Sequence, residues 1–346
     1  MKINWKAHRR IWLTTLVIIG IAIALVTLVD VEEVIRILKA ADWVILLPAV
    51  LALAAGYAMI ATLWRYLLLN RPRWLSAFHA NNLSNLVNIL TPIPAFPVRI
   101  VVISTDPAVS LPKATSSELV VRLLDQSMRA VVIVITYYLS TRVDISPYSV
   151  LTGIVLLGVA LIFLFWMVRR KDQIVRWGTA LLAHIPRVSD ELAHGIMLDL
   201  MDGLADAGRP DRLVPAWLMA IAAWAFFFAF HFLAVLALGQ TIPLDDMLVI
   251  ALFSLAIAPP SAPAMPGVFH AAVAAALTFV AGYDAELVVA YAVLLHAAEL
   301  ILLAILGLWG LIQVELTFEE LMSSSEKVIE YEEEVGREKM EVGSEK

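Results

Sequence analysis

Three charged residues at helical spacing, Arg122, Asp125 and Arg129, lie inside an otherwise apolar stretch of the sequence. Separations of three and four residues place them on one face of an α-helix. A charge inside a membrane span costs about 2.5–3.5 kcal/mol on insertion scales, so such residues usually face an interior and mark function. Two interpretations follow. Either Asp125 forms an internal ion pair with one arginine, or an arginine left over binds the phosphate of an anionic lipid in a bidentate fork.

A second candidate anion site surrounds Arg99, which follows a cluster of prolines at residues 92–97. A helix that starts after this break would add the positive end of its dipole to the Arg99 guanidinium. The alternative is an interfacial arginine that extends to the membrane surface. Upstream, Asn81, Asn85 and Asn88 occur at spacings of four and three, so their amides share one helix face. That face serves either helix packing or contact with a headgroup.

Histidines supply the remaining candidates. His296 and Glu299, three residues apart in the last apolar stretch, either exchange a proton or form a buried hydrogen-bonded pair. His270, one helical turn past Pro266, has the same two interpretations, whereas His231 lies among aromatic residues and is assigned a structural role. The sequence has no cysteine and no His/Asp/Glu cluster with metal-ligand spacing, so we expect neither a metal nor a cofactor.

The composition is that of a membrane protein. Hydrophobic residues make up 61% of the 346 positions and the mean hydropathy is +0.84, far above the roughly 45–50% apolar content of soluble domains. Residues 315–346 contain eleven acidic and four basic side chains, whereas the first 314 residues contain 21 basic and 20 acidic ones. We therefore predict an all-α, polytopic transmembrane domain over residues 1–314 and an acidic tail over residues 315–346, which accounts for the net charge of −6.

About six apolar stretches are long enough to cross roughly 30 Å of hydrocarbon. The first, Ile11–Val29, is expected to be a retained helix because no small-residue cleavage site follows it. Val31–Ala41 is predicted to be an interfacial amphipathic helix, residues 169–212 an amphipathic extramembrane segment, and Ser104–Ser117 a loop. The other predicted spans are Trp43–Leu69, Glu118–Ser140, Tyr148–Val168, Val214–Leu238 and Glu286–Leu311.

Two further apolar segments are broken by prolines, the first at Asn88–Arg99 and the second at Ala258–Gly267. Proline removes a backbone donor, and an unsatisfied polar group is costly in hydrocarbon, so each break must be lined by protein or water. Paired interruptions in two parts of a chain point to a transporter-like binding site. Each broken segment is either a re-entrant hairpin or two short spans, which predicts six spans with two hairpins, or eight spans.

Loop charges orient the chain. The N-terminal decapeptide, the Arg71–Arg73 loop and residues 169–212 are rich in Lys and Arg, and short cytoplasmic loops carry such an excess. Alternation then places both termini in the cytoplasm. If both broken segments are re-entrant hairpins, they have opposite orientations, an arrangement common in secondary transporters. We expect a multi-pass protein of the cell membrane.

Three motifs give the sequence a resemblance to a known family, the transmembrane region of lysylphosphatidylglycerol synthases. The first is Asn88, Pro92 and Arg99, and the second is Arg122-Leu123-Leu124-Asp125. The third is Pro266-Gly267 opening a helix, followed by a last helix that ends near Gly307 and carries His296 where the family often has Arg or His. The resemblance covers roughly residues 5–311 and implies a flippase-like membrane domain, which occurs alone or fused to enzymes.

Two carboxylates common in that family are missing. Phe96-Pro97-Val98 stands where relatives place Gly-Glu before the first arginine, and His270-Ala271 stands where they place Glu after the Pro-Gly turn.

We interpret the protein as one that binds an amphiphilic lipid, such as an aminoacylated phospholipid or a polyprenyl-phosphate carrier, and moves it between leaflets. An enzyme is not expected, because the sequence has no glycine-rich nucleotide loop and no Asp-x-Asp motif. The alternatives are a component of a lipid-modifying transferase and a scaffold that recruits a protein through its acidic tail. No nucleic-acid partner is expected. The candidate headgroup-binding residues are Arg99, Arg122, Asp125, Arg129, Asn85, Asn88, Pro266, Gly267, His270, His296 and Glu299.

Overall fold

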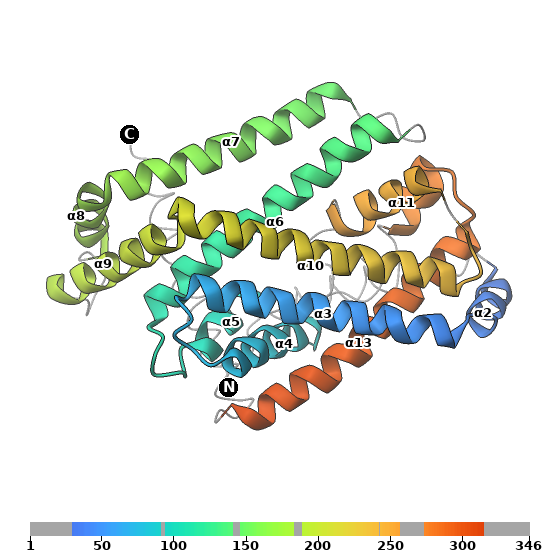
Figure 1. Cartoon of the computed structure of the whole chain (residues 1–346), viewed down its shortest axis with the longest axis horizontal. Helices are drawn as coiled ribbons and strands as arrows, with labels where there is room; N and C mark the ends of the chain where they lie inside the picture. The colour runs from blue at the N-terminus through green and yellow to red at the C-terminus, as the bar shows by residue number, and fades with distance from the viewer. Residues whose placement is uncertain are drawn as a thin grey trace, which may run out of the picture. The chain divides into compact units, whose positions relative to one another are not determined.

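The computed structural model describes residues 30–90, 94–140, 146–182, 189–241, 243–256 and 273–314 (Figure 1). Within these ranges the regular elements are helices and none is a strand, which confirms the all-α fold. The predicted first span, the Pro266-Gly267 turn with His270, and the acidic tail lie outside the described residues.

The helices of the described residues follow the predicted segments closely. They are α2 (Val31–Lys39), α3 (Trp43–Leu67), α4 (Trp74–Leu90), α5 (Ala95–Ile103), α6 (Leu111–Leu139), α7 (Pro147–Arg169), α8 (Lys171–Leu182), α9 (Asp190–Ala207), α10 (Pro210–Ala237), α11 (Leu244–Ala251), the π-helices η1 (Leu252–Ala256) and η3 (Ala276–Val280), and α13 (Ala285–Gln313).

Exposed apolar surfaces indicate that these helices lie in a membrane. Among the described residues, α3, α10 and α13 are long and apolar enough to cross a membrane. Helix α7 exposes large apolar side chains, among them Ile162 and Phe165, and α3 does the same at Val44 and Leu47. Patches of this kind are rare on soluble monomers and are stable against lipid tails.

The chain divides into two compact units. The first comprises Met1–Gly56, Gln126–Leu156 and Trp224–Leu302, and the second comprises Tyr57–Asp125, Leu157–Ala223 and Leu303–Lys346. The long helices α3, α6, α7, α10 and α13 contribute residues to both units.

In the first unit, the amphipathic helix α2 packs on the start of α13. The Asp30 carboxylate caps α2 by accepting from the backbone N–H of Glu32 at 2.9 Å and of Glu33 at 3.2 Å, as helix starts require. The Asp30 N–H in turn donates to Glu286 Oε1 at 3.3 Å. On its apolar face, Val34 packs against Val289 and Ala290 of α13. These contacts confirm the predicted amphipathic helix.

In the second unit, the first broken segment is a pair of short helices, α4 and α5, which lie side by side (Figure 1). Helix α5 has only 9 residues, about 13 Å at 1.5 Å per residue, which is less than half of the hydrocarbon thickness. Helix α4 buries polar side chains along its length: His79, Asn81, Asn82, Ser84 and Asn88. The interior of this unit therefore contains a row of polar groups beside its apolar side chains.

The predicted loop over Ser104–Ser117 is wrong in its second half, because α6 already begins at Leu111. The hydroxyls that suggested a loop are satisfied inside the helix. Thr115 donates to the Leu111 carbonyl at 2.9 Å, and Ser117 donates to the Ala114 carbonyl at 2.9 Å. Pro112 is tolerated because the first helical turn needs no N–H donor. Glu118 consequently lies well inside α6 instead of at its start.

Gly307 allows the end of α13 to approach α4 at backbone distance. A Cβ at this position would lie 2.6 Å from Leu86 Cβ and 3.1 Å from the Asn82 carbonyl oxygen. Next to it, the Trp309 ring packs edge-on against His79 with centroids 4.7 Å apart. The contact between these two helices therefore depends on the absence of a side chain at Gly307.

We expect Gly307→Ala to lower the free energy of unfolding by about 1–3 kcal/mol, because the added methyl overpacks the α4 contact. The matched control is Gly153→Ala in α7, where a Cβ meets nothing within 4 Å; its stability should stay the same or rise slightly, since alanine favours helix. Denaturation of the purified protein in detergent measures both. Equal stability of the two variants would contradict the close contact.

Candidate functional site

The second unit contains a buried ion pair between Arg99 of α5 and Glu118 of α6. Arg99 Nη1 donates to Glu118 Oε1 at 3.0 Å and to Oε2 at 3.4 Å. The two side chains are only 13% and 2% exposed. A buried charge that loses its partner is strongly destabilising. Each of these two groups therefore requires the other.

Neighbouring elements fix the orientation of the Arg99 guanidinium. Its Nε donates to Ser84 Oγ at 3.4 Å and its Nη2 donates to Asn85 Oδ1 at 3.3 Å, both on α4. On another side the guanidinium lies 5.9 Å from the centre of the Trp64 ring. The Trp64 Nε1–H donates to Ser117 Oγ at 2.9 Å, which holds the indole against α6. Arg99 is thus positioned by α3, α4 and α6 together.

Arg122 lies one helical turn beyond Glu118 and is the exposed member of the cluster. Its Nε is 3.8 Å from Glu118 Oε1, and its side chain is 51% exposed. The guanidinium stacks over the Phe96 ring at 4.4 Å. A separation of 3.8 Å exceeds hydrogen-bond length, so Glu118 attracts Arg122 electrostatically in this contact without accepting a hydrogen bond. One buried carboxylate therefore faces two guanidinium groups, of which one is accessible from outside.

The predicted amide face lies on α4. Asn85 is the amide that reaches the cluster, through its bond to Arg99. Asn81 and Asn88 are buried. The Asn81 Nδ2 group has no hydrogen-bond partner among the described residues, and a buried orphan donor of this kind is uncommon in folded proteins.

Arg129 of α6 forms hydrogen bonds with the second broken segment, in the first unit. Its Nη1 donates to the carbonyl oxygens of Leu255 at 2.7 Å and Ala256 at 3.2 Å. Both residues belong to η1, and the second proline cluster follows them in the sequence. A charged donor forms a strong hydrogen bond with a backbone carbonyl, so Arg129 attaches α6 to η1. Asp125, between the two arginines in sequence, is half-buried on α6.

The remaining predicted residues in the described part of the chain lie in the first unit. His296 and Glu299 are both half-buried on α13 in the first unit. His231 is buried, and its Nδ1 lies 2.5 Å from the Tyr291 hydroxyl oxygen, which fits the structural role expected for it. Pro266, Gly267 and His270 lie outside the described residues.

The residue that the sequence reasoning missed is Glu118. It was treated as the boundary of a span because polar residues precede it. A signal was present, since a carboxylate four residues before an arginine on one helix forms a favourable pair, and Glu118 stands in that relation to Arg122.

Apolar helices around a buried charged cluster define the chain as a helical membrane protein. It belongs to the family described as lysylphosphatidylglycerol synthase TM region, whose sequence model matches residues 11–307. The resemblance seen in the motifs is thereby confirmed, and the protein is a lipid-related membrane protein. No curated protein and no solved structure matches the chain.

Replacing Glu118 tests the buried pair. Glu118→Gln preserves shape but leaves the Arg99 guanidinium buried without a carboxylate, so we expect a loss of about 3–5 kcal/mol in unfolding free energy. The double variant Arg99→Gln/Glu118→Gln should lose less than Glu118→Gln alone, because it removes the uncompensated charge. The control is Glu191→Gln, an exposed carboxylate on α9. If Glu118→Gln and Glu191→Gln unfold alike, the pair does not stabilise the unit.

Replacing Arg129 tests the contact with the second broken segment. Arg129→Gln should speed hydrogen exchange in peptides that contain residues 252–256, because the Leu255 and Ala256 carbonyls lose a charged donor. Arg36→Gln, which removes an exposed arginine of α2, serves as the control and should leave that exchange unchanged. Identical protection in Arg129→Gln and the wild type would show that the π-helix holds without Arg129.

Proposed function

We propose that the protein binds the anionic headgroup of a membrane lipid at Arg122 and carries that lipid between the leaflets. The observation that carries the proposal is a half-exposed guanidinium held beside a buried carboxylate. Charged residues within membrane helices usually mark a functional site. A lipid phosphate is a suitable partner, because guanidinium binds phosphate through two parallel N–H donors.

The Arg99–Glu118 pair supports this role by fixing the surroundings of Arg122. Glu118 accepts two hydrogen bonds from Arg99 and attracts Arg122 at longer range. The Phe96 ring adds a cation–π contact from α5. A site whose orienting groups are already paired can bind an anion with little rearrangement, which lowers the entropy cost of binding.

The short helices of the first broken segment support movement of the bound lipid. Helix α5 is too short to cross the membrane alone, and it packs against α4. We propose that this segment is a re-entrant hairpin and that transport is a rocking of the helices around the bound headgroup, as broken helices permit in other transporters. With the termini in the cytoplasm of a cell-membrane protein, the hairpin opens from the cytoplasmic side. The protein acts as a transporter and not as an enzyme.

Lipid scrambling in proteoliposomes tests the function. The full chain should equilibrate a fluorescent anionic phospholipid between leaflets, whereas Arg122→Gln should slow this exchange by about tenfold or more, because a charge-assisted hydrogen bond to the phosphate is lost. Arg122→Lys keeps the charge without the fork and should be intermediate.

The control for this assay is Arg73→Gln, which removes an exposed arginine after α3 and should scramble like the wild type. Melting temperatures of all variants in detergent exclude loss of folding as the cause. Equal scrambling by wild type and Arg122→Gln would refute this form of the hypothesis. Conversion of the labelled lipid to a new product by the protein and a cytosolic extract would favour a lipid-modifying transferase instead.

A further inference from the structure

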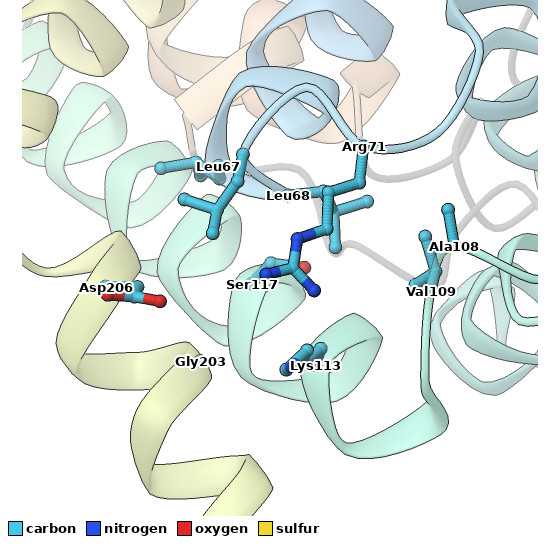
Figure 2. A pocket seen from close by; sticks show the side chains of 10 residues that line it. Leu67, Leu68, Arg71, Ala108, Val109, Lys113, Ser117, Gly203 and Asp206 are labelled. Atoms are coloured by element: carbon cyan, nitrogen blue, oxygen red, sulfur yellow. The ribbon is translucent and has the colours of Figure 1, made fainter.

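The second unit also contains a pocket lined by basic side chains. Arg99, Glu118 and Arg122 are not among its lining residues. The pocket lies between the end of α3, the start of α6 and helix α9 (Figure 2). Its lining residues are Leu67, Leu68, Leu69, Arg71, Ala108, Val109, Lys113, Ser117, Gly203 and Asp206.

The turn after α3 places Arg71 at this pocket. Leu69 and Asn70 adopt left-handed backbone conformations with φ of 62° and 55°, which is uncommon for leucine. Two hydrogen bonds hold the turn: the Asn70 N–H donates to the Arg65 carbonyl at 2.9 Å, and Arg65 Nε donates to the Pro72 carbonyl at 2.9 Å. Arg71 therefore projects from an ordered turn.

Close contact between α6 and α9 forms the opposite wall. A Cβ on Gly203 would lie 2.1 Å from Ser116 Oγ, so the backbone of α9 approaches the first turns of α6. This approach places Asp206 of α9 and Lys113 of α6 on the same pocket.

The charges at the pocket are two cations and one carboxylate. Figure 2 shows the Arg71 side chain extending from its turn toward Ser117 and Lys113, with Asp206 reaching in from α9. Within the part of the chain that the structure describes, neither the Arg71 guanidinium nor the Lys113 ammonium makes a hydrogen bond or ion pair. The two cations outnumber the single carboxylate of Asp206, so the pocket carries a net positive charge that attracts an anion.

The rest of the pocket favours an amphiphilic anion. Leucine and valine side chains make up much of its lining. The pocket also lies directly after α3, whose 25 residues extend about 37 Å and therefore cross the hydrocarbon layer of about 30 Å. Basic residues just beyond a span lie at the level of the lipid headgroups.

We propose that this pocket binds the phosphate of a membrane phospholipid between Arg71 and Lys113, with the glycerol and upper acyl carbons against Leu67, Leu68 and Val109. The site holds a lipid at the membrane surface and does not depend on transport at Arg122. Asp206 opposes a purely anionic headgroup, so removing its charge should strengthen binding.

The test measures binding of dioctanoyl phosphatidylglycerol to the full chain in a neutral detergent, by isothermal titration and by native mass spectrometry. Arg122→Gln serves as the parent protein, so that the proposed transport site does not contribute. Adding Arg71→Gln or Lys113→Gln should each weaken binding by about tenfold, since each removes a charge-assisted contact. Adding Asp206→Asn should tighten binding by about threefold. Adding Arg73→Gln should change nothing, because Arg73 does not line the pocket.

Inorganic phosphate and glycerol 3-phosphate at the same ionic strength distinguish a lipid from a free anion. If either binds as tightly as the lipid, the pocket is a free-phosphate site and the lipid proposal is overturned. It is also overturned if Arg71→Gln and Lys113→Gln bind like the parent, or if Asp206→Asn weakens binding. Loss of all lipid binding in the Arg122→Gln parent would refute this pocket and leave the transport proposal intact.

Discussion

The buried carboxylate of Glu118 is the group on which the arrangement of the second unit depends. An ion in a membrane interior needs a counter-ion and hydrogen bonds, and Glu118 obtains both from Arg99 at 3.0 Å. Arg99 is carried by α5, a helix of 9 residues that is too short to be stable in isolation. The ion pair, together with the bonds from Arg99 to Ser84 and Asn85, therefore ties a broken piece of chain to α4 and α6.

Helix α6 supplies a polar partner to each of the two broken segments. Its Glu118 carboxylate accepts from the Arg99 guanidinium of α5, and its Arg129 guanidinium donates to the Leu255 and Ala256 carbonyls of η1. Both contacts are charge-assisted hydrogen bonds. Glu118 and Arg129 thus attach α6 to both broken segments. Arg122, on the same helix, lies beside the Glu118 carboxylate and has a half-exposed side chain.

Much of the fold was predictable. The ends of α3, α7, α10 and α13 were predicted within a few residues, because apolar runs of membrane length form helices. The amphipathic α2 followed from Val34, Ile35 and Leu38. The boundary at Ser104–Ser117 was mistaken, because hydroxyls that bond back to their own helix look the same in a sequence as hydroxyls in a loop. The cost of charge in a membrane predicted Arg122, the preceding proline break predicted Arg99, and the helical spacing of three amides predicted Asn85, whereas Glu118 was predicted only as the boundary of a span.

The sequence by itself determined that this protein lies in a membrane and that it is helical, since both follow from local composition. Tertiary structure alone decided which charges meet. Arg99 and Glu118 are separated in sequence by the end of α5 and the start of α6, and Arg71, Lys113 and Asp206 come from three separate elements. Such pairings depend on how helices pack, and packing is set by contacts such as Gly307 on Leu86 and Gly203 on Ser116, which no local pattern encodes.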